Sequence, residues 1–190
     1  SGNSVDDKPF SGGAGMVLRP DVISNAIEKT TSTEELNNSV KICFSAKGKS
    51  LNQSLIEDLK KKENFILLSG RYEGIDQRVV NHYNFEEISI GDYILNGGES
   101  ACIVFMEAII RLQDNVLNNP ETHSNESFKN ELLEHDQFTR PSEWMAPDGS
   151  NYKVPKELLN GNHSDIEKWK KANSEQNTSK NRQDLWKNYL

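Results

Sequence analysis

The chain has 190 residues, of which 34% are hydrophobic, and a formal net charge of −7. This length suits one large and one small domain, and no run approaches the roughly 20 apolar residues of a membrane-spanning helix. No charged-then-apolar leader opens the chain, so we expect a soluble, cytoplasmic protein and exclude a membrane protein. The acidic balance, taken alone, argues against a phosphate-rich partner, because nonspecific nucleic-acid affinity comes from clustered Lys and Arg.

The two cysteines, Cys43 and Cys102, both lie inside apolar runs. Buried, reduced thiols are therefore expected, and metal ligation by cysteine is excluded. Cationic residues gather in the last quarter of the chain, as Lys168, Lys170, Lys171, Lys180, Arg182 and Lys187. This cluster suits either a local basic face or a solvated helical tail.

The N-terminal third predicts a loop, a helix, a strand and a second helix, in that order. Residues 11–15 (SGGAG) indicate a flexible loop without a preceding strand. Pro20 suits the first position of a short helix with Ile23, Ala26 and Ile27 on one face. Residues 40–45 form an apolar strand-like run, and residues 50–53 resemble a capping box that opens a helix with a leucine-rich stripe.

Two more short apolar runs, residues 65–68 and 87–90, flank a helix predicted for residues 76–83. Strands that alternate with helices imply a parallel α/β sheet. Residues 99–112 form the most apolar helix candidate, and we expect this helix to lie at the centre of the core.

The polar, turn-rich stretch of residues 115–130 indicates a domain boundary. We accordingly expect a first domain over residues 1–116, a linker over 117–130 and a small helical domain over 131–190. In the last, a helix over 155–159 ends at Asn160-Gly161, and residues 164–167 resemble a capping box that opens a helix reaching Lys171.

Four glycine-bearing segments follow the predicted strands, at residues 45–48, 70–74, 91–93 and 97–98. In parallel α/β sheets ligands bind at the carboxyl ends of the strands, so these segments suggest a pocket, although each also suits an ordinary turn. Neither GxGxxG nor GxxxxGK[ST] occurs in these loops, and no nucleophile elbow is present. The histidines lack metal-ligand spacing and suit surface or capping positions; they are His82, His123, His135 and His163.

Longer motifs add a resemblance to these patterns. LLSGRYEGIDQRVV (residues 67–80) and EEISIGDYILNGGES (86–100) resemble the core signature of the bacterial tRNA (guanine-N1)-methyltransferases, which belong to the trefoil-knotted SPOUT class. SGGAGMVLRP (11–20), TRPSEW (139–144) and LLNGNHSDIEKWK (158–170) match the same family in the same order. The resemblance covers almost the whole chain.

The resemblance implies an α/β fold whose parallel sheet carries a deep C-terminal trefoil knot, followed by a small all-α domain that binds tRNA. It implies S-adenosylmethionine as cofactor, a homodimer with the active site at the interface, and tRNA bound across both chains. The family's cofactor-binding positions correspond to Phe44, Ser45, Ala46, Gly70, Glu73, Ile90, Gly91, Asp92, Tyr93, Ile94, Leu95, Gly97 and Gly98. Its substrate-binding positions correspond to Arg71, Arg140, His163 and Lys168.

The reaction that the resemblance implies is methylation of N1 of the guanosine 3′-adjacent to the anticodon. Because N1 carries a proton at neutral pH, the reaction needs a base, and a cation should stabilise the charge that grows on O6. Arg111 matches the charge-stabilising arginine of the family, and the alternative is a charge at the end of a helix. Glu126 matches the general base of the family, and the alternative is a solvated loop residue. Glu73 lies near the sulfonium or organises a Mg²⁺ ion, or else forms an ion pair with Arg71 or Arg78.

The sequence departs from the family pattern at three places. Glu126 stands where aspartate is usual, Ala46 where proline is usual, and the strand and helix that the family has before residues 5–9 are missing. An extra methylene at a catalytic carboxylate can cost on the order of 100-fold in rate. A catalytically impaired RNA-binding module with the same fold, or a methyltransferase of another RNA, are therefore the alternatives.

Overall fold

A computed structural model of the chain describes residues 4–10, 12–114, 116 and 126–190. The chain forms two compact units, Ser1–Leu117 and Asn118–Leu190, called the first and second unit below. Part of the expected linker, residues 117–125, lies outside the described residues. Within the described part of the chain, no helix has the length and apolar character needed to cross a membrane.

The first unit is built on a three-stranded parallel sheet with the strand order β4-β3-β5. Its strands are β3 (Val40–Ser50), β4 (Phe65–Leu68) and β5 (Glu86–Ser89). The predicted parallel α/β sheet is thus confirmed, although β3 is longer than the predicted strand. The pairing of β3 with β5 shifts between Phe44 and Lys49. At this bulge a Cβ on Gly48 would lie 2.4 Å from the backbone of Glu87, so only glycine fits there.

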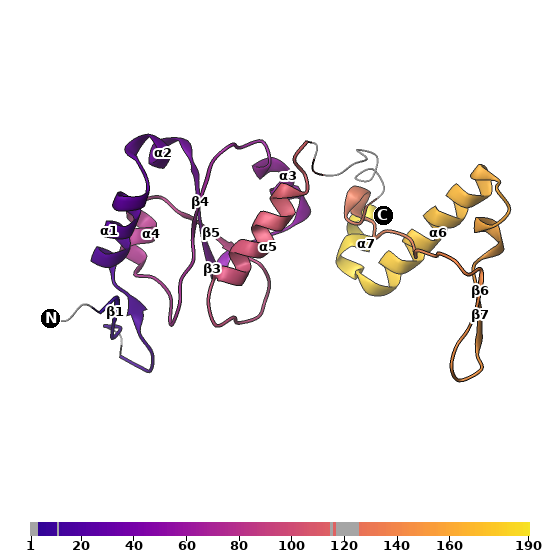
Figure 1. The fold of residues 1–190 in the computed structure, drawn as a ribbon, viewed down its shortest axis with the longest axis horizontal. Helices are drawn as coiled ribbons and strands as arrows, with labels where there is room; N and C mark the ends of the chain where they lie inside the picture. The colour runs from indigo at the N-terminus through magenta and orange to yellow at the C-terminus, as the bar shows by residue number, and fades with distance from the viewer. Residues whose placement is uncertain (1–3, 11, 115, 117–125) are drawn as a thin grey trace. The chain divides into compact units, whose positions relative to one another are not determined.

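Helices lie on both sides of this sheet (Figure 1). On one side are α1 (Pro20–Thr30) and α4 (Gln77–His82), and on the other are α3 (Gln53–Leu59) and α5 (Glu99–Ile110). A short helix, α2 (Thr33–Asn38), follows α1. Pro20 occupies the first turn of α1, as predicted, where its missing N–H leaves no hydrogen bond unmade.

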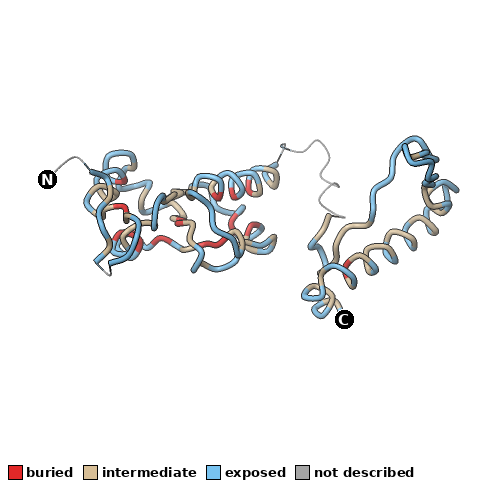
Figure 2. The backbone as a smooth tube through the Cα atoms, turned by 90° about the horizontal axis from the view of Figure 1, so that it is seen from below, coloured by how far each residue is buried: buried red, intermediate tan, exposed pale blue. Residues whose placement is uncertain are grey.

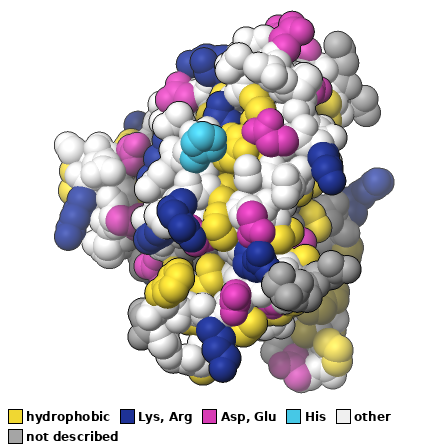
Figure 3. Space-filling view, turned by 90° about the vertical axis from the view of Figure 1, so that its left-hand side faces the viewer, with side chains coloured by type: hydrophobic (Ala, Val, Ile, Leu, Met, Phe, Trp, Pro, Cys, Tyr) yellow, Lys and Arg dark blue, Asp and Glu magenta, His cyan; other side chains and the backbone are white. Residues whose placement is uncertain are grey.

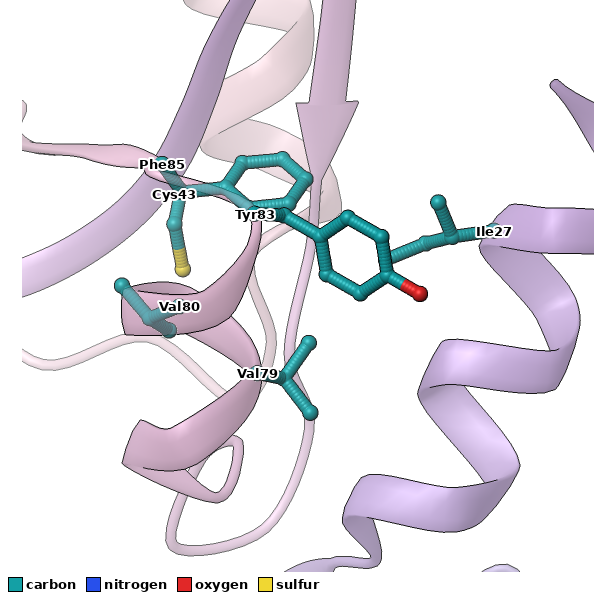
Figure 4. Close-up of a cluster of buried hydrophobic side chains, with 6 residues drawn as sticks. All are labelled: Ile27, Cys43, Val79, Val80, Tyr83 and Phe85. Atoms are coloured by element: carbon teal, nitrogen blue, oxygen red, sulfur yellow. The ribbon is translucent and has the colours of Figure 1, made fainter. Parts of the chain in front are cut away.

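Each side of the sheet has its own cluster of buried side chains. On the α1 and α4 side, Tyr83 and Phe85 pack with Ile27, Val79 and Val80 (Figure 4). On the other side Phe105 of α5 is 1% exposed, and its ring lies 5.9 Å from that of Phe44 and 5.5 Å from that of Phe65. Figure 2 shows that the buried residues are concentrated in the first unit.

The most apolar helix, α5, is only partly inside the core. Ala101, Phe105 and Ile109 are buried, as expected for a core helix. Its opposite face is exposed and carries Ile103, Val104, Met106 and Ile110, together with the exposed Glu107. The expectation that this helix contributes to the centre of the core is thus confirmed for one face, and the other face is exposed in the single chain.

Several helices and strands begin or end at other residues than the sequence predicts. Helix α3 begins after Asn52, whose Oδ1 accepts a hydrogen bond from Leu55 N at 2.9 Å, so the capping residue is Asn52 and not Ser50. Helix α6 (His163–Asn181) is capped in the same way by Asn162 and runs well beyond Lys171. The SGGAG loop lies between two short paired strands, β1 (Asp6–Asp7) and β2 (Val17–Leu18), instead of lacking a preceding strand.

The second unit contains short helices and one hairpin. Besides α6, its elements are η2 (Lys129–Glu131), β6 (Glu143–Met145), β7 (Asn151–Lys153), η3 (Lys156–Leu158) and α7 (Gln183–Tyr189). Thr178 of α6 is fully buried, and its hydroxyl accepts a hydrogen bond from Leu133 N at 2.8 Å. This bond ties the segment before the hairpin to the long helix.

The β6–β7 hairpin makes the expectation of an all-helical second unit wrong. Its turn is closed by Gly149 N, which donates to Ala146 O at 2.9 Å, and Gly149 adopts φ +87°. The intervening Pro-Asp pair favours such a turn, because proline presets φ and aspartate bonds nearby backbone. Trp144 and Tyr152 stack across the strands with ring centroids 5.7 Å apart, and this pairing compensates for the short strands.

Candidate functional site

A cavity of about 480 Å³ opens in the first unit beside the segments that follow β4 and β5 and the middle of β3. This volume lies in the range of small-molecule sites in proteins. Residues from three stretches of the sequence, 43–47, 70–80 and 87–101, form its wall. The lining residues are Cys43, Phe44, Ser45, Ala46, Lys47, Gly70, Arg71, Tyr72, Glu73, Gly74, Ile75, Gln77, Val80, Glu87, Ile88, Ser89, Ile90, Gly91, Tyr93, Leu95, Gly97, Gly98 and Ala101.

Backbone contacts join the two glycine-rich loops of this wall. Gly98 N donates to Gly70 O at 2.8 Å, and Arg71 pairs with Gly97 in an isolated antiparallel bridge. The Arg71 guanidinium also donates to Glu99 Oε1 at 2.7 Å, at the start of α5. The pKa of Glu99 lies below its ordinary value because its own backbone N–H and Arg71 both hydrogen-bond to the carboxylate.

Two glycines of the wall are required by the backbone geometry. Gly91 adopts φ +147°, and a Cβ there would lie 2.4 Å from Cε1 of Tyr93. A Cβ on Gly98 would lie 3.2 Å from Gly70 N, closer than most side chains are found to backbone. Glycine thus lets the two loops approach each other, and leaves the backbone of residue 91 accessible to a ligand.

The ionisable groups of the wall do not form a nucleophilic centre. Burial raises the pKa of the Cys43 thiol to about 11, with Glu87 adding to the effect, so this thiol stays protonated at neutral pH. Glu87 lies 3.5 Å from the Lys47 ammonium, which also donates to Gln77. The cavity therefore suits binding of a small molecule with apolar and polar parts better than covalent catalysis.

The structure brings most of the predicted cofactor contacts together at this cavity. All of them line it except Asp92 and Ile94, and Ile94 is 86% exposed. Arg71, predicted to bind substrate, also lines the cavity. Sequence reasoning missed the lining residues Glu87, Ser89 and Gln77. Glu87 and Ser89 lie in a predicted strand and Gln77 near the start of a predicted helix, so their closeness to the glycine segments was a usable signal.

The other predicted residues lie outside the cavity wall. Arg111 caps α5, and its backbone N–H donates to Glu107 O at 3.2 Å. Glu126 belongs to the second unit, as do the remaining predicted substrate contacts. Of these, Arg140 lines a hollow of about 260 Å³, Lys168 lines one of about 590 Å³, and His163 is the first residue of α6.

The sequence left open whether Glu73 forms an ion pair with Arg71 or Arg78, and both arginines have other carboxylate partners in the structure. Arg71 pairs with Glu99, and Arg78 pairs with Asp76 at 2.8 Å. Across the described residues, no three His, Cys, Asp or Glu side chains gather in a way that would hold a metal ion. The described residues thus offer no such cluster, and no chemistry is assigned to Mg²⁺.

Comparisons with known proteins agree with each other. The family model described as tRNA (Guanine-1)-methyltransferase TrmD matches residues 1–188. A tRNA (guanine-N(1)-)-methyltransferase of Ruegeria pomeroyi is 42% identical over 186 residues, which are 98% of this chain and 74% of that protein. A protein of the same name from Clostridioides difficile is 43% identical over 183 residues, 96% of this chain and 77% of that protein.

Proposed function

Since the chain belongs to the tRNA (guanine-1)-methyltransferase family, we propose that it transfers a methyl group from S-adenosylmethionine to N1 of the guanosine 3′-adjacent to the anticodon in tRNA. The observation that carries this proposal is the cavity. The segments that resemble the family most, residues 70–74 and 90–98, meet there and hydrogen-bond to each other. We propose that the second unit binds the tRNA. We also propose that the protein acts in the cytoplasm.

The cavity wall suits the chemical groups of S-adenosylmethionine. Phe44 and Leu95 offer apolar surface for an adenine ring, and the backbone around Gly91 offers polar groups for the base and ribose. When bound, the cofactor supplies an electrophilic methyl group on a sulfonium. We propose that the loops at residues 44–46, 70–73 and 90–98 hold it, with the sheet and these loops forming the family's trefoil knot.

The chain's own residues must then prepare the guanine. We propose that the Glu126 carboxylate accepts the N1 proton and that the Arg111 guanidinium stabilises the negative charge on O6. Cys43 is an unsuitable base or nucleophile, because its thiol stays protonated at neutral pH. Glu126 is one methylene longer than the aspartate that is usual at this position. We therefore expect its side chain to adopt another conformation than that aspartate when its carboxylate reaches N1.

The second unit offers groups that suit an RNA. Trp144 and Tyr152 on the hairpin are 55% and 58% exposed, and aromatic faces of this kind stack on unpaired bases. Arg140 and Lys168 would contact phosphates. Figure 3, which views the molecule from the side of the first unit, shows acidic and basic side chains interspersed on that face.

The exposed face of α5 supports a homodimer. Ile103, Met106 and Ile110 lie three and four residues apart, so they share one side of the helix, and all are exposed. These side chains form an exposed apolar patch beside Glu107, and such patches mark interaction sites, so a second copy of the chain is the proposed cover. This arrangement would place the active site at the interface between the two subunits.

Methyl transfer from labelled S-adenosylmethionine tests the proposed function. The three acceptors are an unmodified tRNA transcript with guanosine 3′ of the anticodon, a matched transcript with adenosine there, and unmodified ribosomal RNA. Label in the guanosine transcript alone is the expected result. Cofactor binding without label in either transcript would instead identify an impaired RNA-binding module, and label in ribosomal RNA alone would identify a methyltransferase of another RNA.

A further inference from the structure

Gly15, at the end of the SGGAG loop, lies beside a residue of the cavity wall. A Cβ placed on Gly15 would lie 2.5 Å from Cγ, 2.6 Å from Oε1 and 2.9 Å from Cδ of Glu73. Glu73 lines the cavity, whereas Gly15 does not. Any side chain at residue 15 would therefore collide with a cavity side chain without itself entering the site.

The backbone holds Gly15 against Glu73 through several hydrogen bonds. Glu73 N donates to Met16 O at 2.9 Å, and Leu18 N donates to Gly74 O at 2.9 Å. Leu18 also pairs with Ile75 in a parallel bridge. Because residues 16–18 are fixed along residues 73–75, the collision cannot be relieved by moving the loop alone. Rotation of the exposed Glu73 side chain is the cheaper response, and it displaces the carboxylate.

We propose that Gly15 is a positioning residue, which keeps the Glu73 carboxylate at the rim of the cavity by leaving room for its side chain. The inference rests on the proposed function, in which Glu73 contacts S-adenosylmethionine. It assigns to the loop before β2 a part in cofactor binding, although no residue of this loop lines the cavity.

The chain offers a matched control in the same loop. Gly13 adopts φ +104° and Gly15 φ +92°, so alanine strains the backbone similarly at both positions. A Cβ on Gly13 meets nothing within 4 Å. Gly13→Ala therefore reproduces the backbone strain of Gly15→Ala without the collision.

Calorimetric titration with S-adenosylmethionine compares Gly15→Ala, Gly13→Ala, Glu73→Ala and the double variant Gly15→Ala/Glu73→Ala. Loss of a hydrogen bond to a charged group predicts about a 10-fold weaker affinity for Gly15→Ala, and a change below about 3-fold for Gly13→Ala. All three colliding atoms lie beyond Cβ of Glu73. In the Glu73→Ala background, Gly15→Ala is therefore expected to add less than about 2-fold.

Equal losses for Gly15→Ala and Gly13→Ala, or a full effect of Gly15→Ala without the Glu73 side chain, would overturn the proposal. If Gly15→Ala fails to fold, the double variant is expected to recover a cooperative thermal transition, and its failure to do so also overturns the proposal. A crystal structure of Gly15→Ala needs no ligand: an unmoved Glu73 carboxylate refutes the positioning role. Absence of cofactor binding by the unmodified protein refutes the proposed function instead.

Discussion

Replacement of Ile103 by glutamate should separate the proposed dimer into monomers. Ile103, Val104, Met106 and Ile110 expose 61%, 48%, 42% and 51% of their surface, so a partner can bury about half of each side chain. Full burial of such a side chain stabilises by about 1.5–3 kcal/mol, so this face contributes roughly 3–6 kcal/mol per protomer. A two-fold interface contains each residue twice, and Ile103→Glu therefore adds two carboxylates to it.

Each unpaired buried charge costs several kcal/mol, and 1.4 kcal/mol changes an equilibrium tenfold. The dimer Kd should therefore rise by at least about 1,000-fold. Sedimentation velocity over a dilution series measures it, with Leu190→Glu as control, because Leu190 is 88% exposed at the C-terminus. Circular dichroism verifies folding. A folded Ile103→Glu variant that dimerises like the unmodified protein would refute the role of this helix face.

Four further predictions concern cofactor binding, methyl transfer, tRNA binding and stability. Gly91→Ala forces Tyr93 away and strains the backbone, so cofactor affinity measured by calorimetry should fall by about 10-fold or more. The control Gly149→Ala also replaces a glycine at positive φ and should leave cofactor affinity unchanged. Arg111→Ala should reduce single-turnover methyl transfer at least about 100-fold and leave cofactor affinity nearly unaltered; equal losses would contradict its role. Trp144→Ala should weaken tRNA binding about 5- to 100-fold in a filter-binding assay without affecting the cofactor. Because burial raises the pKa of Cys43, the folded chain keeps the thiol proton that the unfolded chain releases above about pH 9.0. The free energy of unfolding should therefore fall as the pH rises from 9.0 towards 11. Urea unfolding measures this fall, which should be shallower for Cys43→Ala.

The sheet and most of its helices follow from local sequence patterns. The apolar run at residues 65–68 predicts β4 with its observed bounds, because a buried parallel strand needs continuous apolar side chains. The run at 40–45 stops short of the end of β3, since its second half is polar and pairs beyond a bulge that depends on Gly48. Helix starts at Asn52 and Asn162 escaped prediction because neighbouring serines offered equally plausible caps.

Part of the cavity wall could be predicted from the sequence, through two different signals. Glycines after strands are a local signal, and the resemblance extended it to side chains such as Phe44 and Leu95. The contact between Gly15 and Glu73 joins residues far apart in the sequence, and no periodic pattern encodes it. The hairpin had a readable Pro-Asp-Gly turn, but its strands have only three residues each, too few for a period-two pattern to be distinguished from a loop.

Cofactor binding and proton removal should be separable properties of this chain. The glycine-rich wall belongs wholly to the first unit, whereas Glu126 belongs to the second. Within the wall, the Cys43 thiol retains its proton at neutral pH, so this thiol is not suited to deprotonate a guanine. Substitutions of the wall glycines should therefore act on cofactor affinity first. Substitution of Glu126 should act on the methyl-transfer step with the cofactor still bound, because a base is needed only after the guanine has arrived.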